Sequence, residues 1–174
     1  MAKNKHPAQA LRPRQIAADY APDDDRPLLP YAVLTGGYAV AFGGALVALR
    51  ASGRELPERI TVADVALIGV ATHKLSRLLA RDRIASFLRA PFTRFQGPAG
   101  PGEVDEAVRG AGMERAVGEL LICPYCLAQW GASGLMLGLV AAPRLTRLLS
   151  AVMVAHTIAD FMQVGYYQAT STLG

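Results

Sequence analysis

The 174-residue chain has little charge, few aromatic residues and almost no cysteine. Charged residues make up 18% of it and aromatic residues 7%, and it contains two cysteines and three histidines. Two cysteines are too few for the disulfide framework of a small secreted domain. A net charge of +4, without aromatic residues interleaved among basic ones, argues against nucleic acid as a partner. Phosphate-binding glycine loops, zinc-protease helices and nucleophile elbows are also missing from the sequence.

Apolar residues dominate instead, and they are arranged in blocks. They make up 52% of the chain, and the mean hydropathy is +0.24. A helix of about 20 apolar residues is long enough to cross the hydrocarbon core of a bilayer. Four runs approach this length, near residues 31–49, 61–79, 124–142 and 148–167. We therefore predict an all-α fold, a small integral membrane bundle of about four transmembrane helices, with the lipid bilayer as its main partner.

The remaining segments set the expected domains and topology. Residues 1–29 read as a flexible polar tail, and residues 30–174 as the membrane domain. Between the second and third spans, residues 81–117 form an expected amphipathic cytoplasmic segment. Within it, Arg89 should lie near the polar face of a short interfacial helix, and residues 103–117 should be helical. The tail and this segment carry eleven Lys and Arg against five in the other loops, which predicts that both termini are cytoplasmic.

Both cysteines lie in one short motif, Cys123-Pro124-Tyr125-Cys126. Proline fits best at the first position of a helix, so Pro124 predicts a helix start with Cys123 near its cap. The helix dipole there favours a thiolate. Glutaredoxins share this dithiol sequence, but no βαβ pattern surrounds it, so we reject a thioredoxin-like fold. The alternative is that both cysteines simply pack as small apolar residues.

Ionisable residues are also placed within the apolar runs. His73, Lys74 and Arg77 follow the apolar part of the second run, and His156 and Asp160 lie one helical turn apart in the fourth. Such residues inside a membrane are costly and are usually paired or functional. We predict an intramembrane ion pair of Asp160 with Lys74 or Arg77.

Several motifs together resemble one family. They are ATHKLSR at 71–77, LRAPF at 88–92, GELL at 118–121 and CPYCLAQW at 123–130. These motifs are similar to those of a bacterial family of small multi-pass membrane proteins, a domain of unknown function that includes a sporulation protein of bacilli. The resemblance covers about residues 64–167. It implies a bacterial inner-membrane protein, and it supplies no activity and no catalytic residues.

Three functional hypotheses remain, in order of preference. The first is a structural or interaction protein without enzymatic activity, which forms homo-oligomers through the glycine-rich faces of Gly36, Gly43, Gly134 and Gly138. The second is a zinc site built from Cys123, Cys126, His73 and His156, or from the cysteine pairs of two copies. The third is a membrane thiol-disulfide oxidoreductase that passes electrons from the cysteine pair to a quinone.

Overall fold

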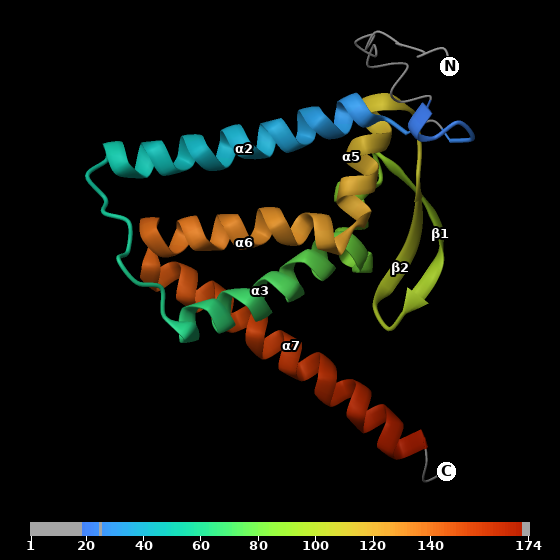
Figure 1. Ribbon diagram of the computed structural model, residues 1–174. Helices are drawn as coiled ribbons and strands as arrows, with labels where there is room; N and C mark the ends of the chain where they lie inside the picture. Colours follow the sequence, from blue (N-terminus) through green and yellow to red (C-terminus); the bar gives the residue numbers. More distant parts are fainter. Residues whose placement is uncertain (1–18, 25, 172–174) are drawn as a thin grey trace, which may run out of the picture.

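The structure is a computed structural model that describes residues 19–24 and 26–171 (Figure 1). Five long helices form its body: α2 (Leu28–Ala51), α3 (Val62–Arg81), α5 (Gly112–Ile122), α6 (Pro124–Ala141) and α7 (Pro143–Ser171). Between α3 and α5 lie the short helices η1 (Arg83–Ala85) and α4 (Ser86–Arg89) and the strands β1 (Thr93–Gly100) and β2 (Glu103–Val108). Most of the predicted tail, residues 1–18, lies outside the described residues.

The long helices alternate in direction. Figure 1 shows α2 and α6 running one way and α3 and α7 running the other, with the β-hairpin beside the end of α3. Helix α3 packs against both α6 and α7, whereas α2 contacts only α5 and α6 extensively. The hairpin, α5 and the start of α2 therefore gather at one end, which we call the hairpin end. The 52–61 connection and the α6–α7 turn lie at the opposite end.

Apolar side chains point outward from this assembly. Helices α2 and α6 bury no residue, and Val40 and Phe161 are 75% and 70% exposed. If this apolar surface faced water, each Å² would cost roughly 25 cal/mol of free energy relative to its burial. The buried polar set is large by comparison: Thr72, Lys74, Ser76, Arg89, Thr93, Glu106, Thr146, Ser150 and Thr157.

Within the part of the chain that the structure describes, two helices, α2 and α7, are long and apolar enough to cross a membrane. The pair α5 and α6, bent by 77° at its break, is a third candidate. The outward apolar surface and these helices indicate a membrane protein. Helix α3 is too charged to meet the same criterion, so a four-helix transmembrane bundle remains a prediction.

The β-hairpin contradicts the all-α expectation and the helix expected over residues 103–117. Strands β1 and β2 pair antiparallel from Thr93 opposite Val108 to Gly100 opposite Glu103. The turn follows Pro101, and Gly102 has a φ of 77°, a conformation that glycine adopts at little cost. Along β2 the inward positions are Val104 and Glu106. Because Glu106 is charged but faces inward, β2 lacks the alternation of apolar and polar residues that predicts a strand from sequence.

Proline sets the boundaries of α6 and α7. The residue before a proline avoids the helical region, and Cys123 before Pro124 has φ −99° and ψ 101°. Helix α5 therefore ends at Ile122, and α6 starts in a new direction. Helix α7 was expected from residue 148 but begins at Pro143, because proline is accommodated at a first helical position. Thr61 caps the start of α3, because its hydroxyl accepts a hydrogen bond from the Asp64 amide at 3.0 Å.

Gly118 allows α5 to approach the hairpin base, which yields a first prediction. A Cβ at this position would lie 2.8 Å from the carbonyl oxygen of Phe92 and 3.1 Å from Val108 Cγ1. We expect Gly118→Ala to destabilise the fold by about 1–3 kcal/mol, the usual cost of overpacking. Gly134→Ala is the matched control, since nothing lies within 4 Å of its added Cβ. Thermal unfolding in detergent, followed by circular dichroism, measures both; equal melting temperatures would contradict the close approach.

Candidate functional site

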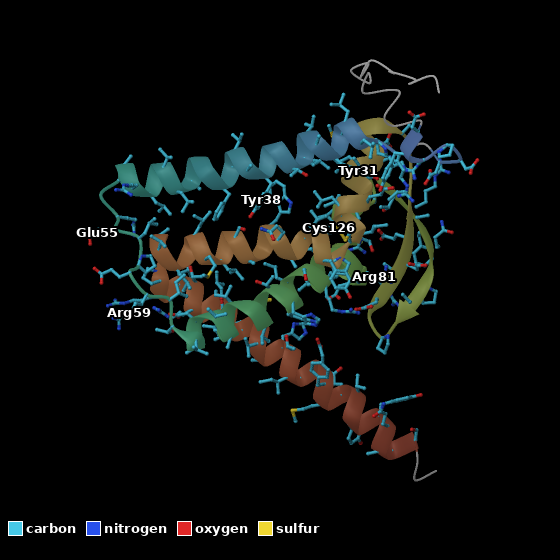
Figure 2. The ribbon with its side chains drawn as sticks, viewed as in Figure 1. Tyr31, Tyr38, Glu55, Arg59, Arg81 and Cys126 are labelled. Atoms are coloured by element: carbon cyan, nitrogen blue, oxygen red, sulfur yellow. A yellow bond between two sulfur atoms is a disulfide. The ribbon has the colours of Figure 1, made fainter. Side chains whose placement is uncertain are left out.

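The two cysteines are joined by a disulfide at the bend between α5 and α6 (Figure 2). Cys123 occupies the extended residue of the bend, and its sulfur accepts a hydrogen bond from the Cys126 amide at 3.1 Å. Cys126 lies in the first turn of α6 and is exposed. The pair is thus an accessible disulfide at a helix start, not two cysteines buried in packing.

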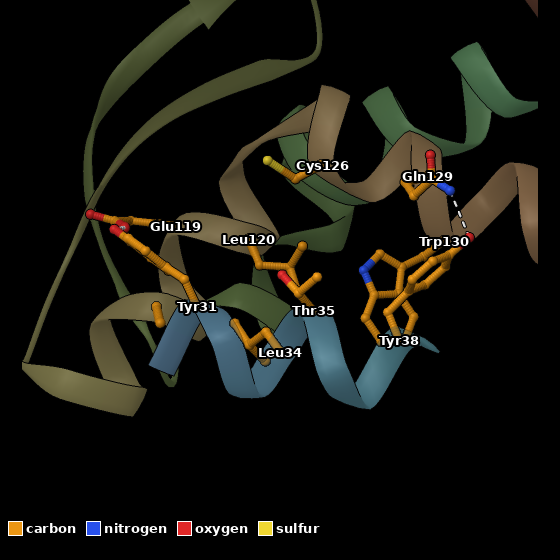
Figure 3. A pocket seen from close by; sticks show the side chains of 10 residues that line it. Tyr31, Leu34, Thr35, Tyr38, Glu119, Leu120, Cys126, Gln129 and Trp130 are labelled. Atoms are coloured by element: carbon orange, nitrogen blue, oxygen red, sulfur yellow. Dashed lines mark hydrogen bonds between the residues drawn. The ribbon is translucent and has the colours of Figure 1, made fainter. Parts of the chain in front are cut away.

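A cavity of about 380 Å³ adjoins Cys126, between α2, α5 and α6 (Figure 3). Trp130 and Tyr38 form an edge-to-face aromatic pair beside it, with ring centroids 5.1 Å apart. The Tyr38 hydroxyl accepts from Gln129 Nε2 at 2.6 Å and shares a hydrogen bond with Ser133 at 2.7 Å. Near the bend, the Tyr31 hydroxyl donates to Glu119. The cavity lining consists of Tyr31, Leu34, Thr35, Tyr38, Ala116, Glu119, Leu120, Cys126, Gln129 and Trp130.

The zinc set suggested by the sequence is not assembled. His73 and His156 are both exposed. Among the described residues, no group of three or more His, Cys, Asp or Glu side chains lies close enough to hold a metal ion. Cys123 and Cys126 therefore have no third ligand within residues 19–24 and 26–171.

An ion pair connects α3 to α7. Lys74 Nζ lies 2.7 Å from Asp160 Oδ2, and Lys74 is only 7% exposed. His156 Nε2 lies 3.7 Å from the other carboxylate oxygen of Asp160. Arg77 points elsewhere: its Nε donates to Glu103 at the start of β2 at 3.1 Å. The structure thus groups Lys74, Asp160 and His156, and it uses Arg77 to hold the hairpin.

Nothing in the sequence indicated a second buried ion pair, because Arg89 was expected on a polar surface. Its side chain is fully buried, with Nε and Nη2 donating to the two oxygens of Glu106 at 2.8 and 3.0 Å. The remaining donors reach the carbonyl oxygens of Leu79 at 2.7 Å and Asp82 at 3.1 Å. Thr93 donates to Glu106 at 3.0 Å. A fully satisfied network of this kind fixes geometry, so we assign it a structural role.

The charge state of Glu106 follows from these contacts. Burial by itself raises the pKa of this carboxyl. Hydrogen bonds from Arg89, Thr93 and Ser86 more than offset burial, so the pKa lies below the usual glutamate value of 4.5. The carboxylate thus remains ionised and paired at neutral pH.

The chain belongs to a family described as a protein of unknown function (DUF1360), whose model matches residues 67–166. This range begins within α3 and ends within α7; it includes the hairpin, the disulfide and the Lys74–Asp160 pair, and it excludes α2. The match confirms the resemblance to a domain of unknown function, whereas the multi-pass membrane character of the family stays a prediction.

One relative has a name that refers to a process. The sporulation protein YjcA of Bacillus subtilis (strain 168) is 28% identical over 102 residues, which cover 57% of this chain and 86% of that protein. No solved structure matches the chain. These comparisons assign no biochemical activity to the family.

The Arg89–Glu106 pair gives a second prediction. Removing one partner of a buried ion pair typically costs about 3–5 kcal/mol, because the other charge is left unpaired. Arg89→Met should therefore unfold at a markedly lower temperature than Arg94→Met, which removes an exposed arginine from the same hairpin.

Protonation of Glu106 at low pH should also weaken the Arg89–Glu106 pair and so remove part of the same stability. Since the folded pKa of Glu106 is depressed, its stabilisation is complete above about pH 4.5 and is lost as pH falls through the folded value. The melting temperature of the native chain should fall on acidification, and Glu106→Gln should flatten that slope. Identical slopes in the two proteins would refute the contribution of Glu106.

Proposed function

We propose that this protein is a structural or interaction protein of the bacterial inner membrane, with no catalytic role for its charged residues. The observation that carries this proposal is the Lys74–Asp160 ion pair, which joins α3 and α7 at 2.7 Å with the lysine almost fully buried. Charges within an apolar surround are stable only when they are paired, so this contact holds two helices in one arrangement. The name of the sporulation relative refers to a cellular process and not to a defined reaction.

We further propose that the chain crosses the membrane several times, with both termini in the cytoplasm. The alternating directions of α2, α3, α6 and α7 support four crossings (Figure 1). Arginines are more numerous in elements at the hairpin end than at the opposite end, and cytoplasmic loops are enriched in Lys and Arg. The hairpin end carries Arg26, Arg77, Arg81, Arg83, Arg89, Arg94, Arg109 and Arg115, against Arg50, Arg54, Arg59, Arg144 and Arg147.

A second copy of the chain is the partner that we propose. His73 and His156 are exposed next to the ion pair, where contact with lipid would be costly and contact with another polar surface would not. Gly36 and Gly134 have open space beside them, which allows another helix to approach closely. Gly138 serves a different purpose, because a Cβ there would lie 2.7 Å from Thr146 Oγ1 of α7. Of the four glycines named from the sequence, Gly138 is thus occupied within the chain.

The ion pair predicts a charge-reversal result. Asp160→Lys leaves two facing cations and should strongly lower the melting temperature in detergent. Combining it with Lys74→Asp restores opposite charges, so the double variant should recover a substantial part of the loss. A double variant no more stable than Asp160→Lys alone would show that the pair does not hold α3 to α7.

Crosslinking tests the interaction surface. A photoreactive amino acid in place of His156 should yield a covalent product of twice the chain mass when native membranes are irradiated. The same probe at Phe161, which is 70% exposed and lies about 140° around α7 from His156, is the control for a position facing lipid. Equal dimer yields at the two sites, or none at either, would contradict the proposed surface.

A further inference from the structure

The cavity beside the disulfide takes no part in the interactions proposed above. Its volume of about 380 Å³ falls within the range of small-molecule sites. Its walls come from α2, α5 and α6, and two of these helices belong to the apolar membrane-facing set. A ligand could therefore enter from the lipid phase, and such a ligand must itself be largely apolar.

The aromatic wall of the cavity is held in a fixed position. Tyr38 is hydrogen-bonded to both Gln129 and Ser133, and its ring packs edge to face with Trp130. On the other sides, Leu34 and Leu120 contribute aliphatic surface. Together these side chains form a rigid space suited to a flat ring with an aliphatic tail.

Two donors in the cavity have no hydrogen-bond partner. Within residues 19–24 and 26–171, neither the indole N–H of Trp130 nor the hydroxyl of Thr35 makes a hydrogen bond, and Figure 3 shows both facing the space between α2 and α6. Donors of this kind in an apolar space match a ligand that carries carbonyl oxygens. Cys126, one half of the disulfide, lines the same cavity as these two donors.

From this arrangement we propose that the cavity binds a membrane-soluble quinone, which accepts electrons from the Cys123–Cys126 pair. The ligand class follows from the combination of a flat aromatic wall, unpartnered donors, access from lipid and an adjacent sulfur pair. The direction of transfer is from dithiol to quinone, which leaves the disulfide that the structure contains.

The reaction consists of two half-reactions, each with two steps. A thiolate from a partner protein attacks the exposed Cys126 sulfur, and Cys123 leaves as a thiolate that keeps its hydrogen bond from the Cys126 amide. The second thiol of the partner then displaces Cys126, so the partner gains a disulfide and Cys123 and Cys126 are reduced. Next, the Cys126 thiolate adds to the quinone ring. Cys123 then attacks Cys126 and expels quinol, with two electrons and two protons transferred to the ring.

The test uses the full chain in lipid nanodiscs. The protein is reduced, freed of reductant and mixed with a fully ring-substituted benzoquinone that carries a decyl tail. A thiolate adds to such a ring only reversibly, because the ring has no proton to lose and no stable thioether can form. We expect two thiols to disappear for each quinol formed, as read by thiol titration and quinone absorbance. Retention of both thiols at saturating quinone would overturn the proposal.

Variants locate the reaction in the cavity. Trp130→Phe keeps an aromatic ring and removes the N–H donor, so the half-saturating quinone concentration should rise about five- to tenfold, the cost of one hydrogen bond. Its reduced thiols should still react at the native rate with a small water-soluble disulfide, which shows that the bend is intact. Tyr166→Phe, on the exposed surface of α7, should match the native chain. An unchanged half-saturating concentration in Trp130→Phe would place the quinone outside this cavity.

Discussion

The ion pair between Arg89 and Glu106 is the contact on which the hairpin end depends. One guanidinium binds the end of α3 through Leu79 and Asp82, and it binds β2 through Glu106. Isolated two-stranded hairpins are marginally stable, so β1 and β2 need this anchor to hold their place. The hairpin base in turn receives α5 at Gly118, where no side chain would fit between helix and strand. The direction of α5, and thus of the bend before α6, follows from a charge pair between two residues that both precede α5 in the chain.

The molecule separates two kinds of stabilisation by location. At the hairpin end, ion pairs and hydrogen bonds connect short elements; among the long helices, small residues and outward apolar side chains dominate. Gly131 faces Leu75 and Thr72 across the α3–α6 contact, with 3.7 Å from an added Cβ to each, and Gly138 meets Thr146 across α6 and α7. Such close contacts suit a lipid surround, where packing rather than expulsion of water drives helix association. The Lys74–Asp160 pair adds one specific polar contact to this otherwise weakly directional packing.

The sequence predicts the long helices well and the hairpin end poorly, and both results have physical reasons. Apolar runs and prolines mark α2, α6 and α7, because nearly uncharged stretches of membrane length leave few alternatives, and a shorter apolar stretch marks the more charged α3. The hairpin was missed because Glu106 occupies an inward strand position and Arg89 is buried, and period and polarity rules assume that charges face outward. Each of these two charges is stable in the interior only because the other one neutralises it. Pairing of this kind between residues 89 and 106 leaves no local signal in either segment.

Some residues that line the cavity lie inside the range matched by the family, and others lie outside it. Cys123, Cys126 and Trp130 lie inside the matched range 67–166, whereas Tyr31, Leu34, Thr35 and Tyr38 belong to α2, which lies outside it. The disulfide and one aromatic wall are therefore part of the unit shared with the family, and the opposite wall is supplied by an additional helix. Helix α2 contributes one of the two unpartnered donors. The selectivity of the cavity for its ligand therefore depends strongly on α2, whereas the sulfur chemistry depends on it less. Bringing α2 against α5 through Tyr31 and Glu119 places that second wall beside the reactive sulfur.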